Sequence, residues 1–209
     1  MASENLDKIN AALRLIDRDL WIVTAHDGPR PGGLVATWVL VASIDPQRPV
    51  LLAGLGPNHF TTELVQASRS FAAHLLRPEQ TQVAWNFARD SGRTRDKLAG
   101  LKVETDETGS PILTDCLASF DCRVFACYDA GDRLYFWADV LSSRHAPRDE
   151  PTGDQGLISR SEMATKTLRE QAFFSSLTPE QRQTLLADRD ADVARNRPLH
   201  EKWRLANPW

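Results

Sequence analysis

The segment at residues 56–65, GPNHFTTELV, gathers amide, imidazole and hydroxyl side chains directly before an apolar helical pattern. Thr61 stands where a helix N-cap is expected, and Thr62 follows in the first turn. The free backbone N–H groups at a helix N-terminus, together with the helix dipole, favour an anion. Asn58 and His59 would supply further donors, so the pattern fits a phosphate site. A helix start that is merely capped has the same residues, and that alternative stays open at this point.

Other recognisable catalytic patterns are absent from the sequence. There is no GxGxxG, GxxxxGK[ST], HExxH or GxSxG motif, which argues against a dinucleotide-binding fold, a P-loop, a zinc protease and a nucleophile elbow. The histidines are scattered and no CxxC pair exists, so no metal site is predicted. The cysteines Cys116, Cys122 and Cys127 are sparse and odd in number, which is typical of a reducing compartment.

Composition excludes several other classes of function. With 209 residues, of which 42% are hydrophobic, the chain can bury a core. A net charge of -3 gives no general attraction for nucleic acid or for an anionic membrane. No run approaches the roughly 18 apolar residues of a membrane helix, and the first ten residues lack the basic and apolar regions of a signal peptide. We therefore expect a cytoplasmic protein with neither nucleic acid nor membrane as a partner.

The elements that would position the 56–65 segment are mostly strands. Ile9, Leu13, Ile16 and Leu20 recur at helical spacing and predict a short helix within the first 20 residues. Apolar, β-branched runs bounded by turn residues then predict strands, and two helices are expected among them. The expected strands cover residues 20–26, 34–43, 50–56 and 70–76, and the expected helices cover 62–68 and 78–90, the second opening at Pro78.

A long β-hairpin is predicted over residues 116–141, with its turn at DAGD. Alternation places apolar residues on one face of each strand. These are Phe120, Cys122, Val124 and Ala126 on the first strand and Leu134, Phe136, Ala138 and Val140 on the second. Consecutive hairpins without regular strand–helix alternation favour an antiparallel barrel over a doubly wound sheet.

The character of the chain changes after His145. Residues 1–145 form the predicted β-rich domain, residues 146–157 have the composition of a linker, and residues 158–209 are expected to be a helical extension. Two capping boxes mark helix starts in the extension. They are Ser159 with Glu162, and Thr178 with Gln181.

The segment at residues 32–65, GGLVATWVLVASIDPQRPVLLAGLGPNHFTTELV, resembles the flavin reductase family with the FMN-binding split-barrel fold. The likeness rests on a glycine loop, a strand of small and hydroxyl residues, an S-x-D-P segment, and a polar loop before a threonine-containing helix. Further matching segments follow in the same order, and the likeness covers about residues 15–145. They are VAWNFARDSGRTRDKLAGL, GSPIL, CLASFDCRV and AGDRLYFWADVL.

The resemblance implies a mainly β chain, an antiparallel split barrel that forms a homodimer and binds FMN, or FAD, in a groove at the subunit interface. The residues carried over are those that match the family's binding segments. The implied cofactor-binding residues are Val35, Ala36, Thr37, Trp38, Val39, Ser43, Asn58, His59, Phe60, Thr61, Arg93 and Lys97.

Two positions depart from the family pattern. Trp38 replaces a small residue, and Arg133 stands where the family has the histidine of a G-D-H triplet near the flavin ring. Arg133 is therefore the candidate catalytic position.

The resemblance predicts an oxidoreductase that takes hydride from NADH or NADPH and passes electrons to a small redox partner or a flavin-accepting oxygenase. Two alternatives stay open: a flavin-dependent oxidase of another small substrate, like pyridoxamine-phosphate oxidase, and a non-enzymatic FMN binder.

Overall fold

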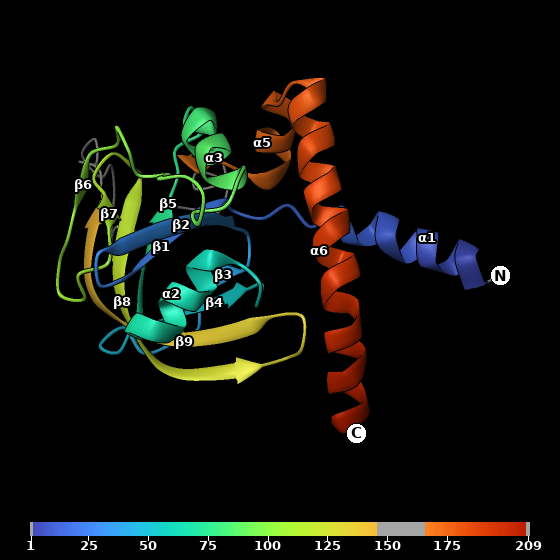
Figure 1. Cartoon of the computed structure of the whole chain (residues 1–209), viewed down its shortest axis with the longest axis horizontal. Helices are drawn as coiled ribbons and strands as arrows, with labels where there is room; N and C mark the ends of the chain where they lie inside the picture. Colours follow the sequence, from blue (N-terminus) through green and yellow to red (C-terminus); the bar gives the residue numbers. More distant parts are fainter. Residues whose placement is uncertain (1, 146–165, 208–209) are drawn as a thin grey trace, which may run out of the picture.

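A curled antiparallel sheet forms the body of the protein (Figure 1). The computed structural model describes residues 2–145 and 166–207. The seven strands lie in the order β2-β1-β5-β8-β9-β4-β3, and neighbouring strands pair antiparallel. Their bounds are β1 Trp21–Asp27, β2 Arg30–Ala36, β3 Val39–Val41, β4 Val50–Leu55, β5 Ser70–Leu75, β8 Ala118–Asp129 and β9 Leu134–His145. A separate pair joins β6 Val103–Glu104 to β7 Ile112–Leu113. The predicted antiparallel architecture is confirmed.

The run at residues 34–43, expected to be one strand, is two. β2 ends at Ala36 and β3 begins at Val39, with Thr37 and Trp38 between them. Because β2 and β3 lie at opposite edges of the sheet, this two-residue break joins the two edges as the sheet curls on itself. The backbone of Trp38 is held by the N–H of Gly54, which donates to its carbonyl at 2.8 Å.

Two hydrophobic clusters lie on the two faces of the sheet. The first is enclosed by the curl and by helix α2, Phe60–Ser68, and contains the fully buried Phe71 and Cys122. The second lies beneath α3, Thr81–Ala88, and α5, Glu170–Ser176, and contains Phe87 and Phe173. The sequence predicted that Cys122 is a core residue, and this is confirmed.

The predicted hairpin is present, but its alternation fails in the first strand. Register shifts occur between Asp121 and Cys122 and again between Val124 and Ala126. The first shift leaves Leu141 of β9 without an opposite residue, and the second leaves Phe125 of β8 without one. Residues 125–129 are exposed on both faces of the strand, so Ala126 is exposed rather than buried. The second strand keeps the predicted pattern, since Leu134, Phe136 and Ala138 are buried and Val140 is partly buried.

The first helix, α1, is shorter than the apolar pattern predicted. It covers Ala2–Leu13, whereas Leu20 lies outside it and is buried in the second cluster. α1 extends away from the body (Figure 1), and Leu6, Ile9 and Leu13 remain exposed. α3 begins at Thr81 rather than Pro78, because the residues before it form a turn closed by hydrogen bonds between Arg77 and Gln80.

The long helix α6, Pro179–Ala206, runs along one side of the body (Figure 1). It begins at the predicted capping box, in which Thr178 Oγ1 accepts from Gln181 N at 3.2 Å and Gln181 Oε1 accepts from Thr178 N at 2.8 Å. The other predicted capping box, Ser159 with Glu162, and the predicted linker at 146–157 lie outside the described residues. None of the helices in residues 2–145 and 166–207 is long and apolar enough to cross a membrane.

Candidate functional site

A cleft of about 940 Å³ lies between the sheet body and α6. One wall is formed by the end of β2, the loop before α2 and the first turn of α2, and the other is formed by α6 between Leu185 and His200. Most of the residues predicted from the sequence line this cleft. They are Val35, Thr37, Asn58, His59, Phe60, Thr61, Arg93, Lys97 and Arg133.

Four predicted residues do not line the cleft. Ala36 and Val39 are buried in the first hydrophobic cluster. Trp38 stacks on Tyr135, with ring centroids 6.4 Å apart and planes within 4°. Ser43 Oγ donates to Arg48 O at 2.8 Å and accepts from Val50 N at 3.0 Å, so its hydroxyl organises the loop before β4. A binding role for these four stays a prediction, and the contacts seen here are structural.

The first turn of α2 differs from the predicted capped start. The helix begins at Phe60, its N-cap is His59, and no side chain caps it, so the assignment of Thr61 as N-cap is wrong. Thr62 Oγ1 donates back to Gly56 O at 2.7 Å. Thr61 is only 2% exposed, and within the described residues its hydroxyl has no protein partner. An uncapped helix N-terminus with an adjacent free hydroxyl is suited to binding an anion.

The side chains of Asn58 and His59 point to α6. Asn58 Nδ2 donates to Asn196 Oδ1 at 2.6 Å, and His59 Nε2 lies 2.9 Å from Asp192 Oδ2. Both were predicted as donors open to a phosphate, whereas both hold the C-terminal helix. Asp192 and Asn196 were not predicted as site residues. The available signal was their spacing of four residues, which places both side chains on one helix face.

Two cations lie on the cleft wall beside α2. Arg93 forms an ion pair with Glu63 and lies over the Phe60 ring, with its guanidinium carbon 5.5 Å from the ring centroid. Lys97 is 5% exposed, and its ammonium donates to Phe87 O at 2.8 Å. Burial lowers the pKa of Lys97 to about 8. Lys97 is therefore a buried cation and not a solvated loop residue.

Arg133 lies at the end of the cleft formed by the β8–β9 turn. Its guanidinium carbon is 4.7 Å from the centroid of Trp38, and Nη1 donates to Asp132 O at 2.6 Å. The Trp38 ring is in turn stacked on the ring of Tyr135. Arg133 is thus fixed on an aromatic surface at the cleft and is half-buried.

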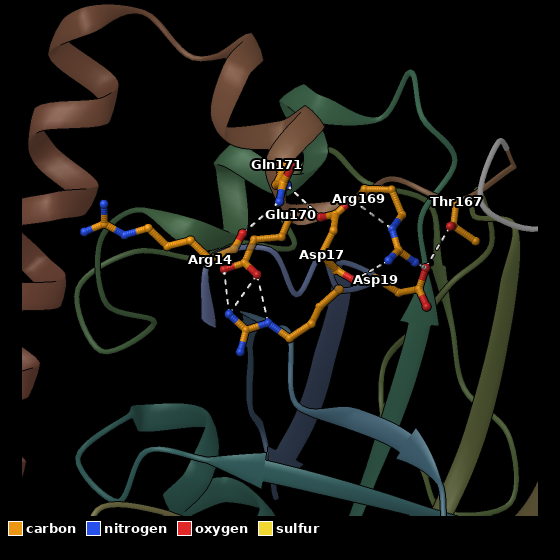
Figure 2. Close-up of polar contacts among 8 residues, drawn as sticks. Arg14, Asp17, Asp19, Thr167, Arg169, Glu170 and Gln171 are labelled. Carbon is orange, nitrogen blue, oxygen red and sulfur yellow. Dashed lines mark hydrogen bonds and ion pairs between the residues drawn. The ribbon is translucent and has the colours of Figure 1, made fainter. Parts of the chain in front are cut away.

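A polar network fixes the chain where it enters α5 and α6. Figure 2 shows residues 14–19, which precede β1, facing residues 167–171. Arg18 binds Glu170 through two bonds of 2.8 and 3.1 Å. Asp19 Oδ1 accepts from Arg169 Nη1 at 2.7 Å and from Thr167 Oγ1 at 2.8 Å. These contacts place the start of the C-terminal helices beside the cleft.

Comparison with known proteins identifies the body of the molecule. Residues 13–165 match the family model of the flavin reductase like domain. The chain belongs to this family. The match confirms the resemblance read from the sequence, and α5 and α6 lie beyond the matched residues of this flavin reductase-like domain.

Among its relatives is the diflavin flavoprotein A 1 of Synechocystis sp., 30% identical over 66% of this chain and 24% of that protein. The chain thus spans about a quarter of that relative's length. The FMN reductase (NADH) SmoA of Agrobacterium fabrum is 29% identical over 75% of this chain and 87% of its own length. The crystal structure of a nitrilotriacetate monooxygenase component B homologue from Mycobacterium thermoresistibile is similar with a TM-score of 0.62 and 24% identity, over 72% of this chain and 82% of that one. The structural similarity confirms the split-barrel fold.

Proposed function

We propose that this chain binds FMN in the cleft between the barrel and α6 and acts as a flavin reductase-like oxidoreductase that uses NADH or NADPH. The observation that carries the proposal is the uncapped first turn of α2 at the wall of a cleft of about 940 Å³, where Thr61 lines the cleft and its hydroxyl has no hydrogen-bond partner among the described residues. That volume lies in the range of cofactor sites. The FMN reductase (NADH) among the relatives supports the same activity.

The residues of the cleft fit the parts of FMN. The first turn of α2 and Thr61 would hold the phosphate, with positive charge from Lys97 nearby. Thr37 and the backbone near Val35 would meet the polar edge of the ring system. Arg133 would lie near the ring. The flavin supplies the redox chemistry when bound, and the protein supplies position, hydrogen-bond donors and a partly water-excluded site.

The spectrum of the purified protein tests this proposal. We expect the protein mixed with FMN to keep a flavin absorption band after gel filtration and to lose it rapidly on anaerobic addition of NADH or NADPH. FAD is tested in the same way, because the cleft volume admits either flavin. A folded protein that retains no flavin would refute the proposal.

One observation favours a second function, a flavin-dependent oxidase of another small substrate. α6 forms one wall of the cleft and narrows access to it, which would disfavour a large co-substrate. Bound flavin that dithionite reduces, but that neither NADH nor NADPH reduces, would point to this oxidase or to a non-enzymatic FMN binder.

We also infer that the chain forms a homodimer. Leu40, Val41, Ile44 and Phe125 are more than half exposed, and such apolar surface is usually covered. Sedimentation at low micromolar concentration should give a species twice the 23.4 kDa of one chain. A monomer would contradict the dimer and any cofactor site shared between subunits.

We also propose a cellular compartment and an electron acceptor for this oxidoreductase. A cytoplasmic location agrees with three free cysteines, of which Cys127 is exposed. The electron acceptor would be a small redox molecule or a flavin-accepting oxygenase. Mixing the reduced protein with each acceptor class and following reoxidation of the flavin distinguishes them.

A further inference from the structure

The C-terminal helix α6 lies outside the family domain and yet forms one wall of its cleft. We propose that α6 is a lid over the flavin site, latched to the loop before α2 by Asn196 and Asp192, and that its opening sets the rate of flavin exchange. This inference rests on the proposed FMN site.

Asn196 makes the central contact of the latch. It is 4% exposed and is the buried residue of α6, and its Oδ1 accepts from Asn58 Nδ2 at 2.6 Å. This hydrogen bond exists only in the closed position, and removing the Asn196 side chain would leave the part-buried Asn58 amide without its partner there, so the pair favours closure.

Asp192 makes the second contact one helical turn earlier. Its carboxylate lies 2.9 Å from His59 Nε2, next to the first turn of α2. The contact engages the imidazole and leaves the Thr61 hydroxyl without a protein partner in the described chain. The latch therefore lies beside the proposed phosphate position and does not replace it. A bound flavin and a closed lid are compatible.

The two ends of α6 are also held. The network around Arg18 and Glu170 fixes its approach to the body (Figure 2). Near the other end, Trp203 packs edge-on against Tyr128 of β8, with ring centroids 6.2 Å apart. The backbone of Gly131 lies so close to α6 that a Cβ there would be 2.7 Å from Leu199 O.

Between these contacts α6 buries little apolar surface. Leu186, Val193 and Leu199 are each more than 40% exposed. A helix held mainly by a few polar contacts opens at a smaller free-energy cost than a core element does. These observations suit a lid that is closed at rest and opens for exchange.

The test measures flavin exchange in the full chain loaded with FMN. Asn196→Ala and Asp192→Asn each weaken the latch, and Asp190→Asn is the matched control, because Asp190 is exposed on α6 and does not line the cleft. Association and dissociation of FMN are followed by flavin fluorescence in a stopped-flow instrument. We expect both rates to rise about tenfold in Asn196→Ala, with a smaller rise in Asp192→Asn and none in Asp190→Asn.

The joint rise of both rates is the signature of a lid. Flavin enters and leaves through the open state, and the latch stabilises the closed state with or without flavin, so the dissociation constant changes little. If Asn196→Ala raises the dissociation rate and leaves the association rate unchanged, Asn196 is a flavin contact and the lid is refuted. Rates equal to those of the unaltered chain in both latch variants also refute it.

A readout without flavin separates this inference from the proposed function. Trypsin cleavage of α6 in the flavin-free protein should be faster in Asn196→Ala and Asp192→Asn than in Asp190→Asn, while the barrel stays intact. If the unaltered chain binds no FMN, the proposed function fails and the trypsin result alone decides whether the latch exists. Equal cleavage in all four proteins overturns the latch.

Discussion

Replacing Gly131 by alanine should displace α6 from the barrel. Gly131 lies in the β8–β9 turn with φ 85°, a conformation that favours glycine. An added Cβ would lie 2.7 Å from Leu199 O, 2.8 Å from His200 Cα and 2.8 Å from Trp203 Cβ. These are backbone atoms and the first side-chain carbon, which cannot rotate out of the way. Either the turn or the helix must move.

The cost has two parts that a control can separate. A left-handed conformation costs an alanine about 1–2 kcal/mol. Overpacking adds about 1–3 kcal/mol. Gly100→Ala carries the first cost alone, because Gly100 has φ 79° and no atom lies within 4 Å of its added Cβ. The difference in lost stability between the two variants is therefore the cost of the clash with α6. That cost corresponds to an undocked population of α6 about fivefold to a hundredfold larger.

Hydrogen exchange of the α6 amides, read by mass spectrometry, measures that population. We expect faster exchange in α6 for Gly131→Ala than for Gly100→Ala, with β1 and β5 protected in both. If the two variants exchange alike along α6, then the helix does not pack against the turn in solution, and the close approach described here is wrong.

Three further results are expected. Thr61→Ala should weaken FMN binding about tenfold to a hundredfold in a titration, because a charge-assisted hydrogen bond worth roughly 1.5–3 kcal/mol is lost. Thr114 is exposed, and the control variant Thr114→Ala should bind FMN normally. Arg133→His should lower the flavin reduction potential by roughly 60 mV, because the arginine charge stabilises reduced, anionic flavin at a distance of ~6 Å with an effective dielectric of ~20. The same change should speed reduction by NADH. An unchanged potential and an unchanged rate would leave Arg133 without a redox role. His74 is fully buried and desolvation lowers its pKa to about 4, so the unfolded chain binds a proton first as pH falls. Stability should be full above pH 6.5 and decline by about 3 kcal/mol toward pH 4 in urea titrations, and a flat profile would contradict the neutral buried state.

Local patterns in the sequence were sufficient for most of the barrel. β1, β4 and β5 follow from apolar, β-branched runs, and the α6 start follows from the Thr178–Gln181 capping box. The failures within the sheet come from its closure and its curvature. Closure of the sheet imposes the break at Thr37 and Trp38, and curvature of the sheet imposes the two register shifts between β8 and β9. Neither feature leaves a local signal in the sequence.

The site was predicted on its barrel side only. Thr61, Lys97 and Arg133 line the cleft as the resemblance implied, although none of their binding roles is tested by the geometry. The opposite wall was missed because Asn58 and Asn196 are 138 residues apart in sequence and pair through polar atoms. Apolar periodicity cannot reveal such a contact. On α6 apolar residues do not mark the contact face, since Leu186 is 45% exposed.

The cleft has a thermodynamic consequence, because its walls come from segments that are remote in the chain. The cleft is shared by residues 33–35, Thr37, the first turn of α2 and the middle of α6. A ligand touching all three is lost when any one of them unfolds, so its binding free energy is added to the stability of each. In a scanning calorimeter the empty protein should lose α6 before the barrel melts. The filled protein should melt in one transition at a higher temperature, with α6 and the barrel unfolding as a single cooperative unit.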